Sequence, residues 1–74
     1  MKKNILILGA SGFMGQNIAN SFLNSNNYNV YGTGNKRHVD NINEYKIFFN
    51  CDLTTKKGIE DVFNQNITYD VVIQ

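Results

Sequence analysis

The stretch that decides the fold is residues 4–23, NILILGASGFMGQNIANSFL. Residues 5–8 form a continuous apolar run that ends at a glycine, which is typical of a strand buried on both faces of a parallel sheet. Beyond the glycines, Met14, Ile18 and Phe22 recur at helical spacing, so the pattern predicts a helix with one apolar face. A strand, a glycine-rich turn and a helix in direct succession are the context in which such a turn binds phosphate.

The rest of the chain continues this alternation. Residues 28–32 and 45–50 are short runs typical of strands, and residues 70–73 begin a fourth buried strand. We expect a loop with one irregular helical turn over residues 33–44, and a second helix whose N-cap is Thr54. The inward face of that helix is predicted to carry Ile59, Val62 and Phe63.

Strands that alternate with helices at this spacing predict an α/β fold, in which right-handed crossovers place helices on both faces of a parallel sheet. The element order matches the first half of a doubly wound, three-layer fold, with about four strands in the spatial order 3-2-1-4. The first strand is then central. The fourth lies at an edge, although residues 71–73 read as a buried strand.

Composition excludes several classes of protein. A chain of 74 residues buries about 60% of its unfolded surface, so a single copy is only marginally stable. The net charge of +1 does not indicate the excess of positive charge that is typical of proteins that bind nucleic acid or an anionic membrane. One cysteine cannot form an internal disulfide, and the apolar run before Gly9 is too short for a secretory signal or a membrane span. We therefore expect a cytoplasmic protein.

The glycines are spaced as G-x-x-G-x-x-G, and each has a distinct expected role. Gly9 allows the chain to reverse at the end of the strand without strain on a Cβ atom. Gly12 removes a side chain where a pyrophosphate would approach the backbone, and Gly15 lets the helix lie close to the first strand.

The amides around Phe13 and Met14 would then face the phosphates at a helix N-terminus, with Ser11 supplying a hydroxyl donor. The alternative interpretation is a glycine-rich connection that binds nothing. A P-loop is excluded, because no Gly-Lys-Ser or Gly-Lys-Thr follows.

Four segments carry a family resemblance: ILGASGFMGQNIA at residues 7–19, VYGTGNKR at 30–37, CDLT at 51–54 and YDVVIQ at 69–74. Together they resemble the N-terminal part of the extended short-chain dehydrogenases/reductases, the family of sugar-nucleotide epimerases, dehydratases and reductases. The match covers the whole chain, with Leu8 as a departure where the family often has Thr. The resemblance implies a Rossmann fold, an NAD(P) cofactor and, in the full-length protein, an oxidoreductase that acts on a nucleotide-sugar substrate.

The residues after the second strand indicate which cofactor is bound. NAD enzymes carry Asp or Glu at this place, where the adenosine ribose hydroxyls are bound. Here the chain has Gly34 and Asn35, followed by the cations Lys36 and Arg37. This exchange of a carboxylate for cations favours a 2′-phosphate, so we expect NADP, with NAD as the second choice. The alternative is that residues 36–38 form a solvated loop that binds no ligand.

Asp52 and Leu53 resemble the pair that contacts the adenine in this family. The resemblance implies that the carboxylate accepts from the exocyclic amine and that the Leu53 amide donates to a ring nitrogen. Asp52 can equally be a helix-entry residue whose charge suits the helix dipole. Cys51 is interpreted as a small buried apolar residue. No metal-ligand cluster is present in the sequence.

The family's catalytic Tyr and Lys, four residues apart on a helix, lie beyond the length of this chain. None of the tyrosines has Lys at the fourth position after it, so we interpret Tyr28, Tyr31, Tyr45 and Tyr69 as packing residues. We therefore expect residues 1–74 to be the truncated N-terminal half of an NAD(P)-binding Rossmann domain, which binds the ADP half of the cofactor and is not catalytic alone.

Two other classes of function remain open. One is a non-catalytic NAD(P)-sensing module, as among atypical members of the superfamily that lack the Tyr and Lys pair. The other is a structural fragment that forms a homo-oligomer through its fourth strand, which is apolar and uncharged over residues 71–74.

Overall fold

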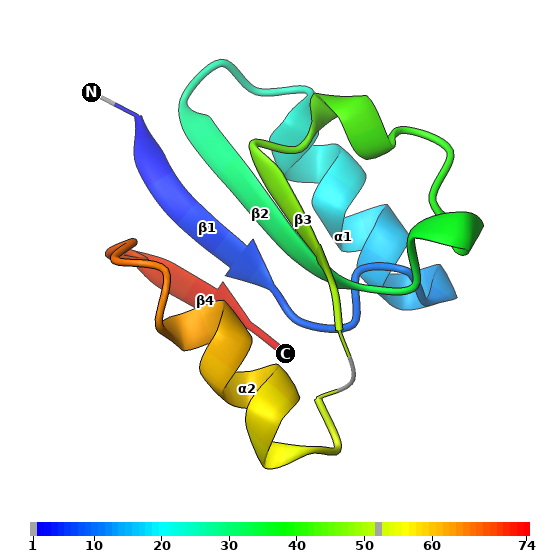
Figure 1. The fold of residues 1–74 in the computed structure, drawn as a ribbon. Helices are drawn as coiled ribbons and strands as arrows, with labels where there is room; N and C mark the ends of the chain where they lie inside the picture. Colours follow the sequence, from blue (N-terminus) through cyan, green and yellow to red (C-terminus); the bar gives the residue numbers. More distant parts are fainter. Residues whose placement is uncertain (1, 52) are drawn as a thin grey trace.

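Four parallel strands form one sheet in the spatial order β3-β2-β1-β4, and helices pack on its faces (Figure 1). The computed structural model describes residues 2–51 and 53–74. The strands are β1 Lys3–Ile7, β2 Tyr28–Gly34, β3 Ile47–Asn50 and β4 Val71–Ile73. The other elements are the helices α1 Phe13–Leu23 and α2 Lys56–Phe63, and the 3-10 turns η1 Lys36–His38 and η2 Ile42–Glu44. The predicted α/β fold and the strand order 3-2-1-4 are confirmed.

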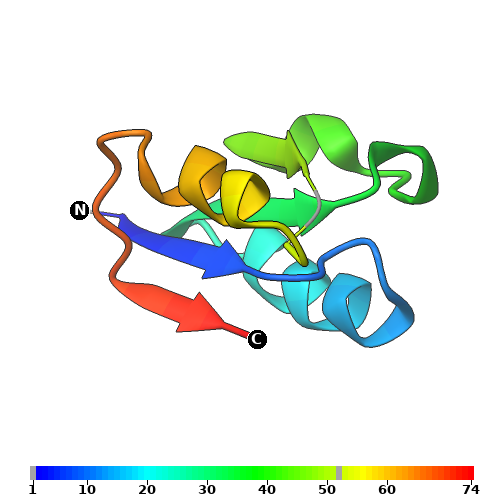
Figure 2. The same cartoon turned by 60° about the horizontal axis from the view of Figure 1, so that its bottom comes forward.

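The central strand is β1, because β2 and β4 both pair with it in parallel. Ile5 lies opposite Val30 of β2 on one side and Val71 of β4 on the other. Ile5, Leu6 and Ile7 are each at most 1% exposed. Neighbouring strands cover both edges of β1, while α1 and α2 lie on opposite faces of the sheet (Figure 2). A strand in this position requires the continuous apolar run that the sequence provides.

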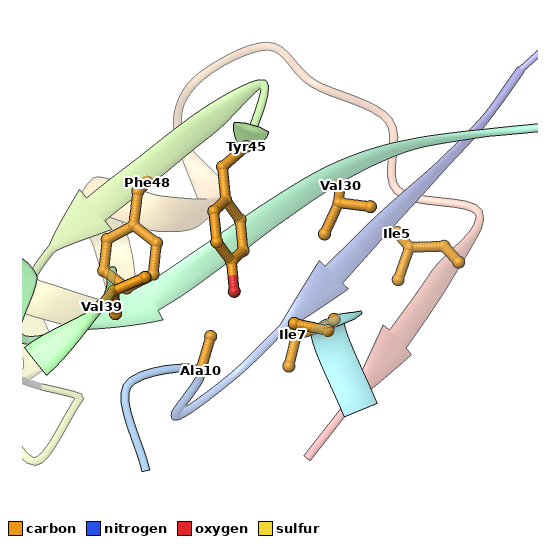
Figure 3. Close-up of a cluster of buried hydrophobic side chains, with 8 residues drawn as sticks. Ile5, Ile7, Ala10, Val30, Val39, Tyr45 and Phe48 are labelled. Atoms are coloured by element: carbon orange, nitrogen blue, oxygen red, sulfur yellow. The ribbon is translucent and has the colours of Figure 1, made fainter. Parts of the chain in front are cut away.

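Successive side chains of a strand point to opposite faces of the sheet, which divides the buried residues into two clusters. The cluster on the α1 face includes Ile5, Ile7, Val30 and Phe48 (Figure 3). Ala19 of α1 belongs to the same cluster. The cluster on the α2 face consists of Leu6, Tyr31 and Val62, with partly buried residues around it. Because helices cover both faces, the carboxyl ends of the strands are where loops can form a ligand site.

Some predicted boundaries are wrong. The strand β2 extends to Gly34 rather than to residue 32, because Thr33 and Gly34 still pair with β3. The strand β3 begins at Ile47 rather than at residue 45. Residues 33–44 contain two 3-10 turns, η1 and η2, in place of one irregular turn.

The N-cap of α2 is Thr55 and not Thr54. The Thr55 side chain accepts a hydrogen bond from the Gly58 N–H at 3.0 Å. An N-cap stands directly before the first helical residue, which here is Lys56. The two adjacent threonines are chemically equivalent, so the sequence pattern placed the cap one residue early.

The predicted inward faces of the helices are only partly buried. Met14 is 74% exposed, Ile59 45% and Phe63 48%. In α2, Val62 is the predicted inward residue that is fully buried. In α1 the buried position is Ala19, and the partly buried residues packed beside it are Ile18, Phe22 and Leu23. Helical spacing identifies an apolar face, but it does not say how much of that face the sheet covers.

The amino end of β4 is tied to the central strand by side chains. Asp70 Oδ2 accepts from the Asn4 N–H at 2.7 Å, and Asn4 Nδ2 donates to the Thr68 carbonyl oxygen at 3.0 Å. Asn29 Nδ2 donates to Asn4 Oδ1 at 3.1 Å, which extends the connection to β2. These bonds fix the mutual positions of β2, β1 and β4 at the amino edge of the sheet.

Tyr45 introduces a polar group into the cluster under α1. Its ring packs edge to face against Phe48, with centroids 5.0 Å apart, and its hydroxyl oxygen points towards Ala10 and Ile7 (Figure 3). Among the described residues, this oxygen is the buried side-chain polar atom that has no hydrogen-bond partner. Burial raises the pKa of the Tyr45 phenol above its usual 10.0, and the adjacent Glu44 carboxylate raises that pKa further.

We expect Tyr45→Phe to raise the free energy of unfolding by about 0.5–1.5 kcal/mol at pH 7, because it removes a polar atom that is buried without a partner. Above pH 10 the unfolded wild-type chain loses a proton that the folded chain retains, so its stability falls as the pH rises. The variant should lose less stability over the same range. Urea unfolding followed by circular dichroism at pH 7 and above pH 10 measures both effects.

Tyr69→Phe is the matched control, because the Tyr69 hydroxyl donates to the Val62 carbonyl oxygen at 3.2 Å. We expect this control to be destabilised by about 0.5–1.5 kcal/mol. A Tyr45→Phe variant that is as destabilised as Tyr69→Phe would contradict the assignment of Tyr45 as unpaired.

Candidate functional site

The turn between β1 and α1 lies at the carboxyl edge of the sheet. Gly9 has a φ of +72°, a left-handed conformation that glycine adopts without steric cost. Next to it, the Leu8 N–H donates to the Ile73 carbonyl oxygen at 2.8 Å, which continues the pairing with β4. The chain therefore leaves the sheet sharply at Gly9, as the sequence predicted.

The turn is fastened to β2 by Thr33, which is fully buried. The Gly9 N–H donates to Thr33 Oγ1 at 3.0 Å, and the Ala10 N–H donates to the Thr33 carbonyl oxygen at 2.7 Å. Sequence reasoning missed this residue because it ended the strand at residue 32. The available signal was a β-branched hydroxyl residue between two glycines, directly after an apolar strand.

Gly15 brings α1 against the turn. A Cβ atom at Gly15 would overlap the Gly9 carbonyl oxygen and lie 2.9 Å from Ala10 Cα, so a side chain here would push the helix away. A Cβ atom at Gly12 would meet only the Gly9 carbonyl oxygen, at an ordinary 3.5 Å. Gly15 is thus required for packing within the protein, whereas Gly12 leaves open the space in front of the helix.

The N-terminus of α1 is open to a ligand. Gly12 is its N-cap, in an extended conformation and with no side-chain cap. The first amides of a helix have no carbonyl partner inside that helix, and the helix dipole makes them attractive to anions. The first turn contains no acidic residue, so no local carboxylate competes for these amides. Phe13 and Met14, at 84% and 74% exposed, flank this end.

A second loop is attached to the turn by Ser11. Its Oγ accepts from the Asn35 N–H at 3.0 Å, and Asn35 Oδ1 accepts in turn from the Arg37 N–H at 3.0 Å. A Cβ atom at Gly34, whose φ is +144°, would collide with the Ser11 side chain. The backbone of η1, which begins at Lys36, therefore starts directly beside the glycine turn.

An open hollow of about 510 Å³ lies where β2 and β3 end, and the described residues that line it are Gly34, Asn35, Arg37, Asn50 and Cys51. Its size is within the range of small-molecule sites. Cys51 is half-buried and also packs against the cluster on the α2 face. Leu53 lies in a second hollow of about 390 Å³, together with Leu8, Gly9, Ile59, Phe63 and Gln74. Asp52 is outside the described residues.

The structure thus gathers most of the predicted site residues at one edge of the sheet. Gly9, Ser11 and Gly12 form the turn, and Asn35 and Arg37 stand across from it. Over residues 2–51 and 53–74, no group of three or more metal-ligating side chains comes together. Within the same ranges, no helix is both long enough and apolar enough to cross a bilayer. The arrangement offers backbone amides and a guanidinium, groups that bind phosphate.

A family model described as the NAD dependent epimerase/dehydratase family matches residues 5–74. The match includes residues 5–7 of β1, the glycine turn, η1 and the whole of β2, β3 and β4. No curated protein and no solved structure matches the chain.

Alanine substitutions should separate the two glycines of the turn. We expect Gly15→Ala to lower the free energy of unfolding by about 1–3 kcal/mol, because the new Cβ overpacks against backbone atoms that cannot move freely. Gly12→Ala should change that free energy by less than about 1 kcal/mol, since its Cβ meets only an ordinary contact. Urea unfolding of both variants tests this contrast, and equal destabilisation would contradict it.

Proposed function

The chain belongs to the NAD dependent epimerase/dehydratase family, and from this we propose that residues 1–74 bind the ADP half of a nicotinamide dinucleotide in an oxidoreductase. Family membership indicates a nicotinamide dinucleotide cofactor and an oxidoreductase-type function. The observation that carries the placement of the cofactor is the uncapped N-terminus of α1, with Gly12 leaving open space in front of it.

In this proposal the pyrophosphate lies on the glycine turn. Gly9 shapes the turn, Gly12 admits the phosphates, and Gly15 keeps the helix close to the sheet. The amides of Phe13 and Met14 donate to the phosphate oxygens, and the helix dipole stabilises their charge. When bound, the nicotinamide ring supplies or accepts hydride, and the residues of this chain hold and orient the other half of the molecule.

We propose NADP as the preferred cofactor. The hollow beside η1 is lined by Asn35 and Arg37, and the place after β2 offers Lys36 where NAD enzymes have a carboxylate. A guanidinium can bind a 2′-phosphate with two parallel hydrogen bonds. Asp52 and Leu53 are proposed to bind the adenine.

For the full-length protein we propose a reductase, epimerase or dehydratase acting on a nucleotide-activated sugar, with residues 1–74 as the N-terminal half of its Rossmann domain. The four tyrosines lie in or beside the two core clusters, which supports a packing role for them. On this basis residues 1–74 alone bind cofactor without catalysing hydride transfer. The second candidate function is that of a non-catalytic NAD(P) sensor, in which the same glycine turn would bind the dinucleotide.

Titration of NADP and NAD into the 15N-labelled chain, followed by NMR, tests the binding function. We expect the amides of residues 9–15 to shift with both ligands, and those of Lys36 and Arg37 to shift more with NADP. Arg37→Gln should weaken NADP binding about tenfold or more and leave NAD binding almost unchanged. Gly12→Ala should weaken both, because its methyl group occupies the space proposed for phosphate.

Lys46→Gln is the matched control for the loss of a positive charge, since Lys46 directly precedes β3 at the amino edge of the sheet, whereas the glycine turn lies at the carboxyl edge. It should bind both ligands as the wild type does. Shifts that avoid residues 9–15, or equal effects of Arg37→Gln and Lys46→Gln on NADP binding, would contradict the proposed site.

We also propose that the chain forms a homo-oligomer through β4. This strand lies at the edge of the sheet, and Val71 and Val72 are 40% and 47% exposed. An uncharged edge strand offers backbone hydrogen-bonding groups to a second copy, and a two-fold axis would pair two such strands antiparallel.

Val72→Lys should shift the chain towards the monomer in light scattering at high micromolar concentration, because a charged edge strand resists pairing. Ile47→Lys is the matched control on the opposite edge strand, where Ile47 is 40% exposed. It should leave the oligomer unchanged. A wild-type chain that is strictly monomeric at that concentration would rule out pairing through β4.

A further inference from the structure

The side chain of Gln16 bridges two segments that are distant in the sequence. Its Nε2 donates to the Ser11 carbonyl oxygen at 2.9 Å and to the His38 carbonyl oxygen at 2.8 Å. A primary amide has two N–H donors, so this group is fully used. One carbonyl belongs to the glycine turn and the other to the last residue of η1.

Together with Ser11, this bridge holds η1 at both ends. The Asn35 N–H, directly before η1, donates to Ser11 Oγ. At the other end of η1, Gln16 Nε2 donates to the His38 carbonyl oxygen. Within the loop, the His38 N–H donates to the Asn35 carbonyl oxygen at 3.1 Å, and the Arg37 N–H donates to Asn35 Oδ1 at 3.0 Å. Hydrogen bonds therefore join η1, which contains Arg37, and the glycine turn into one unit.

Gln16 also occupies the space between two acceptors. Both carbonyl oxygens accept from one nitrogen atom, at 2.9 and 2.8 Å, so loss of the amide would remove both hydrogen bonds and the link between the two segments. Loss of this link would release η1 rather than the glycine turn, because the turn is also held by Thr33 and by the packing of Gly15.

We propose that Gln16 is a positioning residue that fixes η1 relative to the glycine turn and thereby determines selectivity for a dinucleotide with a third phosphate. This inference rests on the proposed cofactor site. A ligand that binds the glycine turn alone does not depend on where η1 stands. A ligand whose additional phosphate must also reach η1 gains affinity when both anchor points are fixed in advance.

The test compares Gln16→Met with Gln65→Met by isothermal titration of NADP and NAD. Gln65 Nε2 donates to the Asp61 carbonyl oxygen at 2.7 Å beyond α2, so its variant also removes an amide-to-carbonyl bond, but away from the turn. We expect Gln16→Met to weaken NADP binding about five- to tenfold and NAD binding less than about twofold. Gln65→Met should change neither affinity.

A second measurement needs no ligand. Hydrogen exchange of the Asn35, Arg37 and His38 amides reports how often η1 leaves its observed position, because all three N–H groups donate hydrogen bonds in that position. In Gln16→Met these amides should exchange about tenfold faster, as an unfastened loop opens more often. In Gln65→Met they should exchange as in the wild type.

The outcomes separate this inference from the function on which it rests. A wild-type chain that binds neither dinucleotide overturns the cofactor site. If the wild type binds both but Gln16→Met weakens NADP and NAD equally, or matches Gln65→Met, the role of Gln16 is overturned. Unchanged exchange of the three amides in Gln16→Met overturns it as well, whatever the binding data.

Discussion

The arrangement of the site depends on one close approach, that of α1 to the glycine turn at Gly15. Without a Cβ atom, this residue lets the helix lie against the backbone of Gly9 and Ala10. The separation between Gly15 and this backbone determines where the amides of the first turn of α1 lie relative to the carboxyl end of β1. It also brings the next residue, Gln16, within reach of the Ser11 carbonyl oxygen. A single missing methyl group thus determines both the geometry of the N-terminal end of α1, where we propose that phosphate binds, and the connection to the neighbouring loop.

The end of β2 is the second fixed point of the site. Thr33 of β2 accepts two hydrogen bonds from the glycine turn, and Gly34 allows the Ser11 side chain to lie against the end of β2. The chain then passes into Asn35, whose amide is bonded to the same Ser11. Each of these contacts joins residues about 24 positions apart, so the turn and η1 become one unit only when β1 and β2 pair in the observed register.

The sequence was sufficient for the strand order and for the glycine turn, because both follow from local patterns and chain connectivity. It was insufficient to predict the burial of Met14, Ile59 and Phe63, which have helical spacing but are 74%, 45% and 48% exposed. Burial depends on what lies opposite a residue, and spacing within one element does not contain that information. The role of Thr33 was missed for a related reason. A hydrogen bond to Gly9 requires knowledge of how two strands are aligned, and only the folded chain supplies it.

The residues that shape the site are uncharged, and this has a physical consequence. Thr33, Ser11, Asn35 and Gln16 hold the two loops through neutral hydrogen bonds. Ion pairs in their place would bring carboxylates close to the amides that we propose bind phosphate, and would weaken the field at the N-terminus of α1. With a net charge of +1, the chain cannot attract a polyanion strongly from a distance. Recognition must then come from short-range contacts, which are effective only when their positions are fixed. Neutral cross-links provide that rigidity without cancelling the positive potential that the proposed cofactor site requires.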